Sequence, residues 1–262
     1  IVKNTDSIYT LFRLPNQESM SKEEVLTKIW EVASECAERI SDTFKHPVQL
    51  ENEKTMAPLF LYGKKRYSCL YYEKKRDGTF SSKVDLKGVQ SVRRDNCKLV
   101  KSICNPIFDK LLYEQDLQGA QDIAKEWIKK LLGNKVEIKE LILSKSLKSK
   151  YKDTNINGRA LPKPAHWFLA EKLRKRDPMT APKGGDRVPF VFIENKDKNA
   201  LQSERVEDPE YAANNPKICI PDVLYYLERQ IESPLNTIFE VLVKDKNGEV
   251  FPRKIKNDGS TE

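Results

Sequence analysis

Residues 58–86 read PLFLYGKKRYSCLYYEKKRDGTFSSKVDL, and this stretch carries the clearest β-strand signal of the chain. Aromatic and branched residues dominate 58–73 and return in 80–86, a composition that favours β-strands. Asp77-Gly78 lies between the two runs, and an Asp-Gly pair supplies the positive backbone angles that a tight hairpin turn needs. The stretch therefore predicts two β-rich segments joined by a hairpin at Asp77-Gly78.

The residues before this stretch predict a further strand and a long helix. Residues 8–14 alternate loosely and stop at Pro15, as a strand does before a turn. Ser21 followed by Glu24 has the spacing of a capping box, which marks the start of a helix. Apolar residues then recur at helical intervals and predict an amphipathic helix over 22–44.

After Asn96 the spacing of the apolar residues becomes helical. The helices expected are 99–111 with a kink or break at Pro106, 120–131 closed by Gly133, 164–176, and 221–239 interrupted at Pro234. A short buried strand is expected over 186–194. The fold class is therefore α+β, with a boundary near Arg94: an antiparallel sheet with a long helix in residues 1–94, and a mostly helical part in residues 95–262.

The two basic zones of the chain point to a phosphate-bearing partner. The net charge is +8, but residues 64–94 alone carry +7 and residues 145–187 carry +8, so the remainder is acidic at −7. A surface that follows a nucleic-acid backbone needs such concentrated charge, because each neutralised phosphate releases counterions. The alternative is a pair of solvated lysine-rich faces without a ligand.

Other function classes find little support in the composition. The five cysteines, Cys36, Cys69, Cys97, Cys104 and Cys219, form no CxxC pair and have no histidine spacing typical of zinc, so reduced thiols inside a cell are expected. The two histidines, His46 and His166, lie in no nucleophile motif, which disfavours cysteine catalysis. No apolar run is long enough to cross a membrane, and no signal peptide is evident. We expect an intracellular protein that is not secreted.

Several short strings occur in an order that is characteristic of one family. They are Thr5-Asp6-Ser7-Ile8-Tyr9, Lys64-Lys65-Arg66-Tyr67, Lys87-Gly88-Val89-Gln90-Ser91-Val92-Arg93-Arg94-Asp95, Arg174-Lys175-Arg176-Asp177-Pro178, Gly185-Asp186-Arg187-Val188-Pro189 and Tyr225-Tyr226-Leu227-Glu228. From Thr5 to about Leu242 the chain resembles the family B DNA polymerases, most closely their delta-type and large-DNA-virus branch. The third and fifth strings are the most specific of the set.

The resemblance implies a piece of a DNA-directed DNA polymerase. Residues 1–94 would be the C-terminal part of the palm, and residues 95–262 the thumb, a surface that grips primer-template DNA. The nucleotide-binding fingers helix has no counterpart here, so deoxynucleoside triphosphates would be used together with the remainder of the polymerase. A processivity factor is a further possible partner, and a nucleus or a viral replication site is the expected location. The alternative is a catalytically inactive DNA-binding fragment or subunit derived from such an enzyme.

The first string implies a metal site. In the family, the YGDTDS motif helps to hold two Mg²⁺ ions that stabilise the attacking and the departing oxygens of nucleotidyl transfer. Asp6 matches the second aspartate of that motif and is the candidate catalytic residue and metal ligand. Asn4 stands where the first aspartate is expected, and an amide cannot replace the lost charge. Asn4 is either a remnant of an intein or gene boundary, or a true substitution.

The other strings supply candidate DNA-binding residues: Lys64, Lys65, Arg66, Tyr67, Lys87, Arg93, Arg94, Lys175, Arg176 and Arg187. We expect Lys64 to Tyr67 to lie on a strand, where Lys65 and Tyr67 share a face. The resemblance implies that Lys65 reaches the minor groove of the primer-terminal pair and that Tyr67 supports the primer backbone. A basic edge strand is the alternative for this string, and a structural ion pair with Asp186 is the alternative for Arg187.

Some polar and aromatic residues near these strings have other expected roles. Glu53 could supply an accessory acidic group, or it could form a salt bridge at the edge of the core. We assign Tyr225-Tyr226, at a helix start, to packing.

Overall fold

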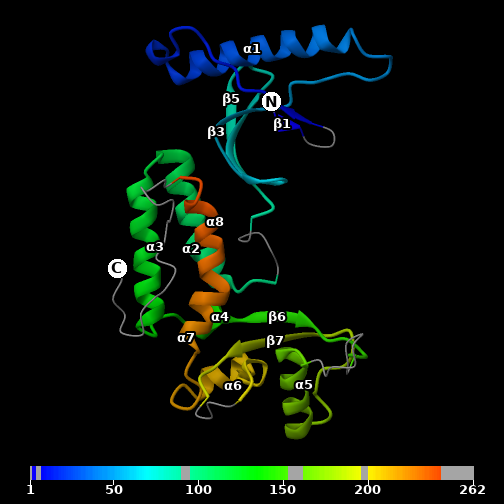
Figure 1. The fold of residues 1–262 in the computed structure, drawn as a ribbon, viewed down its shortest axis with the longest axis vertical. Helices are drawn as coiled ribbons and strands as arrows, with labels where there is room; N and C mark the ends of the chain where they lie inside the picture. Colours follow the sequence, from blue (N-terminus) through cyan, green and yellow to red (C-terminus); the bar gives the residue numbers. More distant parts are fainter. Residues whose placement is uncertain (1, 4–6, 90–94, 153–161, 196–199, 243–262) are drawn as a thin grey trace. The chain divides into compact units, whose positions relative to one another are not determined.

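The structure is a computed structural model that describes residues 2–3, 7–89, 95–152, 162–195 and 200–242. The chain divides into two compact units, Ile1–Gly88 and Val89–Glu262, and each contains buried apolar side chains of its own (Figure 1). The division falls shortly before the boundary expected near Arg94. In the described part of the chain, no helix is both long and apolar enough to span a bilayer.

The first unit is built on a three-stranded antiparallel sheet of β3 (Thr55–Gly63), β4 (Arg66–Lys74) and β5 (Phe80–Lys87). The hairpin at Asp77-Gly78 is confirmed: Asp77 Oδ1 accepts hydrogen bonds from the backbone N–H of Thr79 at 2.9 Å and from its hydroxyl at 2.6 Å. The β-rich run over 58–73 is not one strand but two, because the chain reverses at Lys64-Lys65.

A long helix and a short hairpin complete the first unit. Helix α1 (Lys22–Ser41) ends three residues before the expected Phe44. Its capping box is confirmed: the Glu24 N–H donates to Ser21 Oγ at 3.3 Å, and the Ser21 N–H donates to the Glu24 carboxylate at 2.8 Å. Trp30 of α1 packs edge-on against Phe80 of β5, which fixes the helix on the sheet.

The strand expected over 8–14 is confined to its first two residues. Strands β1 (Val2–Lys3) and β2 (Ile8–Tyr9) pair in antiparallel register, and the 3₁₀ turn η1 (Gln17–Ser19) precedes α1.

In the second unit, a helical layer comes first. It consists of α2 (Lys98–Asp109), the π-helical turn η3 (Lys110–Glu114) and α3 (Leu117–Leu132), so both expected helices are confirmed. Pro106 lies inside α2 without breaking it, and Gly133 caps α3. Ile103, Ile107 and Phe108 are almost fully buried, so the apolar face that the sequence predicts is the packed face.

A second sheet, in the order β6-β7-β8, follows this helical layer. The elements in chain order are α4 (Ile138–Leu141), β6 (Leu143–Ser146), α5 (Ala165–Arg176), β7 (Arg187–Phe192), the 3₁₀ turn η4 (Gln202–Glu204), β8 (Val206–Glu207) and α6 (Pro209–Asn214). Helices α5 and α6 lie against β7 (Figure 1). The sequence predicted α5 and β7 but missed β6 and β8, which are too short to show alternation.

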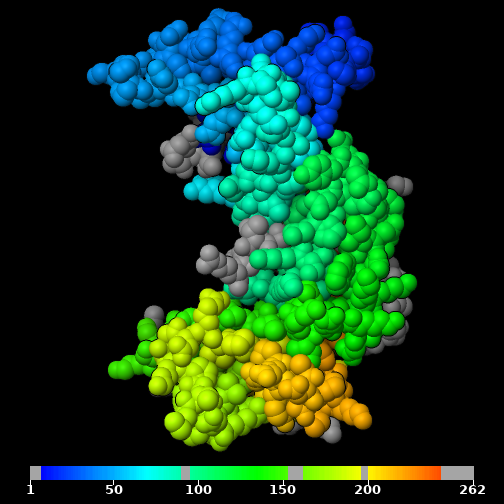
Figure 2. All heavy atoms as spheres, turned by 180° about the vertical axis from the view of Figure 1, so that it is seen from behind, coloured from blue at the N-terminus to red at the C-terminus, as the bar shows by residue number. Residues whose placement is uncertain are grey.

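The C-terminal helices return to the helical layer. They are α7 (Val223–Tyr226), the π-helical turn η5 (Leu227–Ile231) and α8 (Glu232–Phe239). Pro234 is the third residue of α8, which continues directly from η5. A proline has no N–H to donate to the carbonyl four residues before it, so the expected interruption takes the form of this π-helical turn and not of a break. Helix α7 contacts α3 and α8 contacts α2, and Figure 2 shows the orange atoms before α7 directly against the green atoms that follow α3.

Tyr226 joins these helices to the sheet. Its hydroxyl accepts a hydrogen bond of 2.9 Å from the backbone N–H of Phe192, and its side chain is fully buried. The neighbouring Tyr225 stacks on the Phe192 ring with centroids 3.7 Å apart. The assignment of Tyr225-Tyr226 to packing is confirmed.

Candidate nucleic-acid interface

The basic string of the first unit forms the tip of the β3–β4 hairpin. Lys64 and Lys65 are the two turn residues, and only Arg66 and Tyr67 belong to β4, so the expectation that Lys65 and Tyr67 share a strand face is wrong. Lys65 has a φ angle of +60°, a conformation uncommon for residues with a side chain. The turn leaves Lys64, Lys65 and Arg66 exposed and buries Tyr67.

Gly88 brings the second basic string to this turn. In the sheet Tyr67 of β4 lies opposite Lys87 of β5. At Gly88, which has a φ angle of +63°, a Cβ atom would come within 2.4 Å of the backbone oxygen of Lys65. Only glycine tolerates that approach, so it keeps Lys87 beside the exposed turn although 20 or so residues separate the two strings.

Asp85 is the anchor of this cluster, and the sequence analysis did not select it. Its carboxylate accepts a hydrogen bond of 3.0 Å from the Tyr67 hydroxyl, and it lies 3.5 Å from the ammonium groups of both Lys54 and Lys87. Its side chain is only 14% exposed. Asp85 and Lys87 are two residues apart on one strand and share a face, and that spacing is the signal that could have identified Asp85.

Tyr67 is held from two sides. Its ring packs edge-on against Tyr9 of β2, with centroids 6.0 Å apart, and its hydroxyl is bonded to Asp85. Burial, followed by hydrogen bonding to Tyr9 and Asp85, raises the pKa of Tyr67 above its ordinary value. The hydroxyl is therefore a neutral donor whose bond goes to Asp85, and the surface cations are Lys64, Lys65 and Arg66.

The contact between Tyr9 and Tyr67 also places the N-terminal hairpin beside this cluster. Asp6 lies in the connection between β1 and β2, outside the described residues, as does Asn4. Within the described part of the chain, no group of three or more histidine, cysteine, aspartate or glutamate side chains could hold a metal ion. The described residues therefore do not by themselves form a magnesium site.

Arg176 in the second unit forms a two-bond ion pair within the fold. Its guanidinium binds the Glu207 carboxylate through two hydrogen bonds of 2.8 and 2.9 Å, and it lies 4.3 Å from the centroid of the Tyr211 ring. Lys172 adds a third contact to Glu207 at 3.3 Å. Burial raises the pKa of Glu207, yet the bonds from Arg176 and the Asp208 N–H, with the nearby charge of Lys172, bring it below its ordinary value. A guanidinium engaged in this way stabilises the fold, and the contact of Arg176 with DNA stays a prediction.

Arg187 lies at the other end of β7 from this pair. Its guanidinium donates to the backbone oxygen and the hydroxyl of Ser144 at 2.9 and 3.3 Å, whereas Asp186 accepts from the Lys183 N–H. Among the described residues, then, the alternative ion pair between Asp186 and Arg187 is not formed. Lys175 is exposed on α5, next to Arg176 in the chain.

The junction string is only partly described. Arg93 and Arg94 lie outside the described residues. Asp95, at its end, forms an ion pair of 3.2 Å with Lys145 of β6. This pair holds the end of the string against the sheet of the second unit.

Asp85→Asn is expected to loosen the pairing of β4 with β5. The amide keeps the size of the side chain but removes the charge that accepts the Tyr67 hydrogen bond and attracts two lysines, a loss of about 1–2 kcal/mol for a carboxylate this buried. Hydrogen exchange of the β4 backbone amides measures the change.

Glu73→Gln is the matched control, because it makes the same chemical change on the same sheet in an exposed pair with Lys83. Such pairs contribute at most about 1 kcal/mol and often nothing measurable. Equal effects of the two substitutions would show that Asp85 is not an anchor.

The fold and the site together define a basic chain of two units, in which exposed cations converge at a hairpin tip. A sequence model described as DNA polymerase family B matches residues 4–242. The chain belongs to this family.

Sequence similarity to individual proteins supports this family membership. The DNA polymerase delta catalytic subunit of Glycine max is 42% identical over 218 residues, which cover 83% of this chain and 19% of that protein. The DNA polymerase of Acanthamoeba polyphaga mimivirus is 36% identical and covers 97% of this chain and 14% of its own length. The chain thus spans about a fifth or less of these relatives.

A solved structure supports the fold. The family B DNA polymerase from Pyrobaculum calidifontis matches 82% of this chain and 25% of its own, with a TM-score of 0.53 and 23% identity. The mixed helix and sheet arrangement is therefore that of a family B polymerase region.

Proposed function

We propose that this chain is part of a DNA-directed DNA polymerase and binds primer-template DNA, with residues 1–94 as the C-terminal part of the palm and residues 95–262 as the thumb. One observation carries the proposal: Gly88 and Asp85 bring Lys87 to the exposed turn of Lys64 and Lys65, and Tyr9 of β2 packs on Tyr67 at the same place. Several cations on a rigid turn suit successive phosphates of a duplex.

In the complete enzyme, Asp6 would be a ligand of Mg²⁺. Carboxylate oxygen is a ligand type that Mg²⁺ prefers, and the ion supplies stabilisation of the charge that develops during nucleotidyl transfer. The other ligands and the site for the deoxynucleoside triphosphate would come from the remainder of the polymerase. DNA replication in a nucleus or at a viral replication site is the setting that we propose, with a processivity factor as a further partner.

We infer different tasks for Lys65 and Tyr67. Lys65 projects from a turn of fixed conformation and is the residue that would reach the minor groove of the primer-terminal pair. Tyr67 would act indirectly, because its hydroxyl is bound to Asp85 and its ring supports the hairpin. Tyr67 is thus a positioning residue for the turn.

The purified chain is expected to bind primer-template duplex with little sequence preference and a steep salt dependence. Six or so phosphate contacts would give a slope of about −5 in a plot of log affinity against log salt concentration. Fluorescence anisotropy with labelled duplexes of two unrelated sequences measures the slope. Affinity that stays constant between low and physiological salt would refute the proposal.

Lys65→Ala, in a complete polymerase carrying this segment, is expected to weaken extension of matched primers more than of mismatched ones. The minor-groove acceptors occupy equivalent positions in all correct base pairs, so a lysine there binds a correctly paired primer end more tightly. Its loss therefore narrows the difference in extension rate between matched and mismatched primers. Steady-state extension of both primers at two salt concentrations measures the ratio.

Lys64→Ala is the matched control, since it removes the neighbouring exposed cation of the same turn. Removing a lysine that contacts only phosphate weakens the extension of matched and mismatched primers alike and reduces the salt slope by about one unit. If Lys65→Ala behaves in that way, its role is electrostatic.

A further inference from the structure

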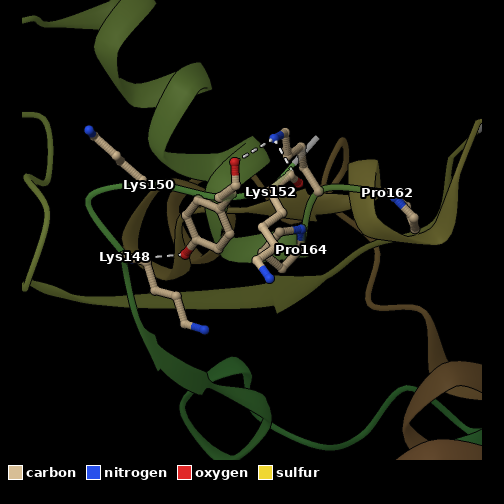
Figure 3. A pocket seen from close by; sticks show the side chains of 7 residues that line it. Lys148, Lys150, Lys152, Pro162 and Pro164 are labelled. Atoms are coloured by element: carbon tan, nitrogen blue, oxygen red, sulfur yellow. Dashed lines mark hydrogen bonds between the residues drawn. The ribbon is translucent and has the colours of Figure 1, made fainter. Parts of the chain in front are cut away.

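A basic pocket lies in the second unit, between the segment that follows β6 and the start of α5. It has a volume of about 410 Å³ and is lined by Lys148, Lys150, Tyr151, Lys152, Pro162, Lys163 and Pro164 (Figure 3). None of these residues belongs to the predicted DNA-binding set. The pocket is therefore a separate feature of the basic zone over 145–187.

One wall of the pocket is built on buried side chains. The Tyr151 hydroxyl accepts a hydrogen bond of 2.9 Å from the Lys148 backbone N–H and lies 2.9 Å from Nε2 of His166. His166 is buried and stacks on Phe190 of β7, with centroids 6.3 Å apart. The tyrosine ring is thus fixed to α5 and to the sheet, so the wall is formed before any ligand arrives.

The state of His166 fits this arrangement. Burial, together with the charges of Lys145 and Lys148, lowers the pKa of His166 below its ordinary value. A neutral imidazole accepts the O–H of Tyr151, and the same hydroxyl oxygen remains available to the Lys148 N–H. The hydrogen bonds therefore hold the Tyr151 ring in one orientation.

The charge around the wall is not balanced by the described acidic residues. Lys148, Lys150 and Lys152 are exposed, and across the described ranges none of the three forms an ion pair with a carboxylate. The Lys163 ammonium lies 3.5 Å from the backbone oxygens of Tyr151 and Lys152, so it ties the segment to the start of α5. Figure 3 shows the Lys148 and Lys150 side chains extending in different directions from this segment.

We propose that this pocket binds a phosphate group through Lys148 and Lys152, with Lys150 adding charge at the rim. Lysine binds phosphate as a compact point charge, and several lysines on a fixed wall favour an oxyanion over a neutral ligand. Such a phosphate has two sources. One is the backbone of duplex DNA, which rests on the proposed function, and the other is a free phosphate or pyrophosphate anion. The pocket adds a contact in the second unit that is independent of the Lys64-Lys65 turn.

The test is a triple substitution, Lys148→Gln, Lys150→Gln and Lys152→Gln, compared with Lys101→Gln, Lys129→Gln and Lys135→Gln. The control removes the same charge from three exposed lysines elsewhere in the same unit. Duplex DNA binding is measured from low to physiological salt. The pocket variant is expected to weaken binding several-fold and to reduce the salt slope by about one unit or more, whereas the control changes the slope less.

A second arm titrates wild type and both variants with inorganic phosphate and with pyrophosphate, followed by ³¹P line width. Loss of DNA affinity in the pocket variant alone identifies the backbone phosphate as the ligand. Pyrophosphate binding that the pocket variant alone loses, with unchanged DNA affinity, supports the site and identifies a free anion as its source. If the two variants do not differ in either arm, the pocket is not a phosphate site. A wild type that binds no DNA refutes the proposed function but leaves the anion arm decisive for the pocket.

Discussion

Arg176→Ala is expected to lower the free energy of unfolding of the second unit by about 2–3 kcal/mol. The Arg176 side chain is 39% exposed, but that of Glu207 is only 5% exposed. The substitution therefore leaves a buried carboxylate without its two-bond partner, which costs more than the pair contributes. Lys172 remains at 3.3 Å and limits the loss. Urea unfolding followed by tryptophan fluorescence in a Trp30→Phe background measures it, because Trp127 and Trp167 both lie in this unit.

Arg174→Ala is the matched control, two residues earlier on the same helix. Arg174 pairs with Glu171 one turn away on an exposed face, and such pairs contribute about 0.3–0.5 kcal/mol. Equal losses in the two variants would show that Arg176 is a surface cation. It would then be available to DNA, as the sequence suggested.

The pH dependence gives a second readout for the same pair. The pKa of Glu207 is below its ordinary value in the folded chain, so its contribution to stability is present above the unfolded pKa and is lost as the pH falls through the folded pKa. Arg176→Ala should flatten this acid-side loss of stability. If Arg174→Ala leaves the dependence of stability on pH unchanged, the effect belongs to the pair of Arg176 with Glu207 and not to the loss of one positive charge.

The elements that the sequence predicted well are those whose signal is local. The capping box of Ser21 and Glu24 begins α1, and Asp77-Gly78 closes the β4–β5 hairpin. In both cases the residues that specify the element make its hydrogen bonds within three positions of one another. Helical periodicity after Asn96 succeeded for the same reason, since a buried helix face repeats every turn.

One error concerns residues 58–73, where β-forming residues on both sides hide a turn at Lys64-Lys65. The chain reverses at these two lysines. The prediction placed them on a strand because most residues on either side of them favour β-structure. The turn is specified by a contact that is distant in sequence, the close approach of Gly88 to the backbone of Lys65. No window of local sequence contains both partners.

The ion pair of Arg176 was not predicted, for a similar reason. Its partner Glu207 lies 31 residues further on, in a strand of two residues that has no periodic signal. Asp85 was missed because a single carboxylate in a basic segment is ordinarily a solvated residue. Its spacing to Lys87 indicates a shared strand face, and the register that sets Tyr67 opposite Lys87 adds the tyrosine as a further partner.

Asp6→Asn is expected to have the largest effect on catalysis in a complete polymerase that carries this segment, with an aspartate at position 4. A metal ion contributes several kcal/mol of charge stabilisation to the transition state of nucleotidyl transfer. Weakening one of its ligands should therefore lower kcat by about a thousandfold, while DNA affinity changes little. Single-turnover extension with Mg²⁺ and a DNA-binding titration on the same variant measure the two quantities.

Asp42→Asn at the exposed end of α1 provides the matched control, because it makes the same chemical change in the same unit away from the hairpin. It should leave both quantities near wild type. The ratio of the loss in kcat to the loss in DNA affinity decides the role of Asp6. Removing a ligand that acts in the transition state lowers kcat alone, whereas removing a residue that supports the hairpin lowers both kcat and DNA affinity. If Asp6→Asn weakens DNA binding as much as turnover, Asp6 acts through the packing of Tyr9 on Tyr67 and is not a metal ligand.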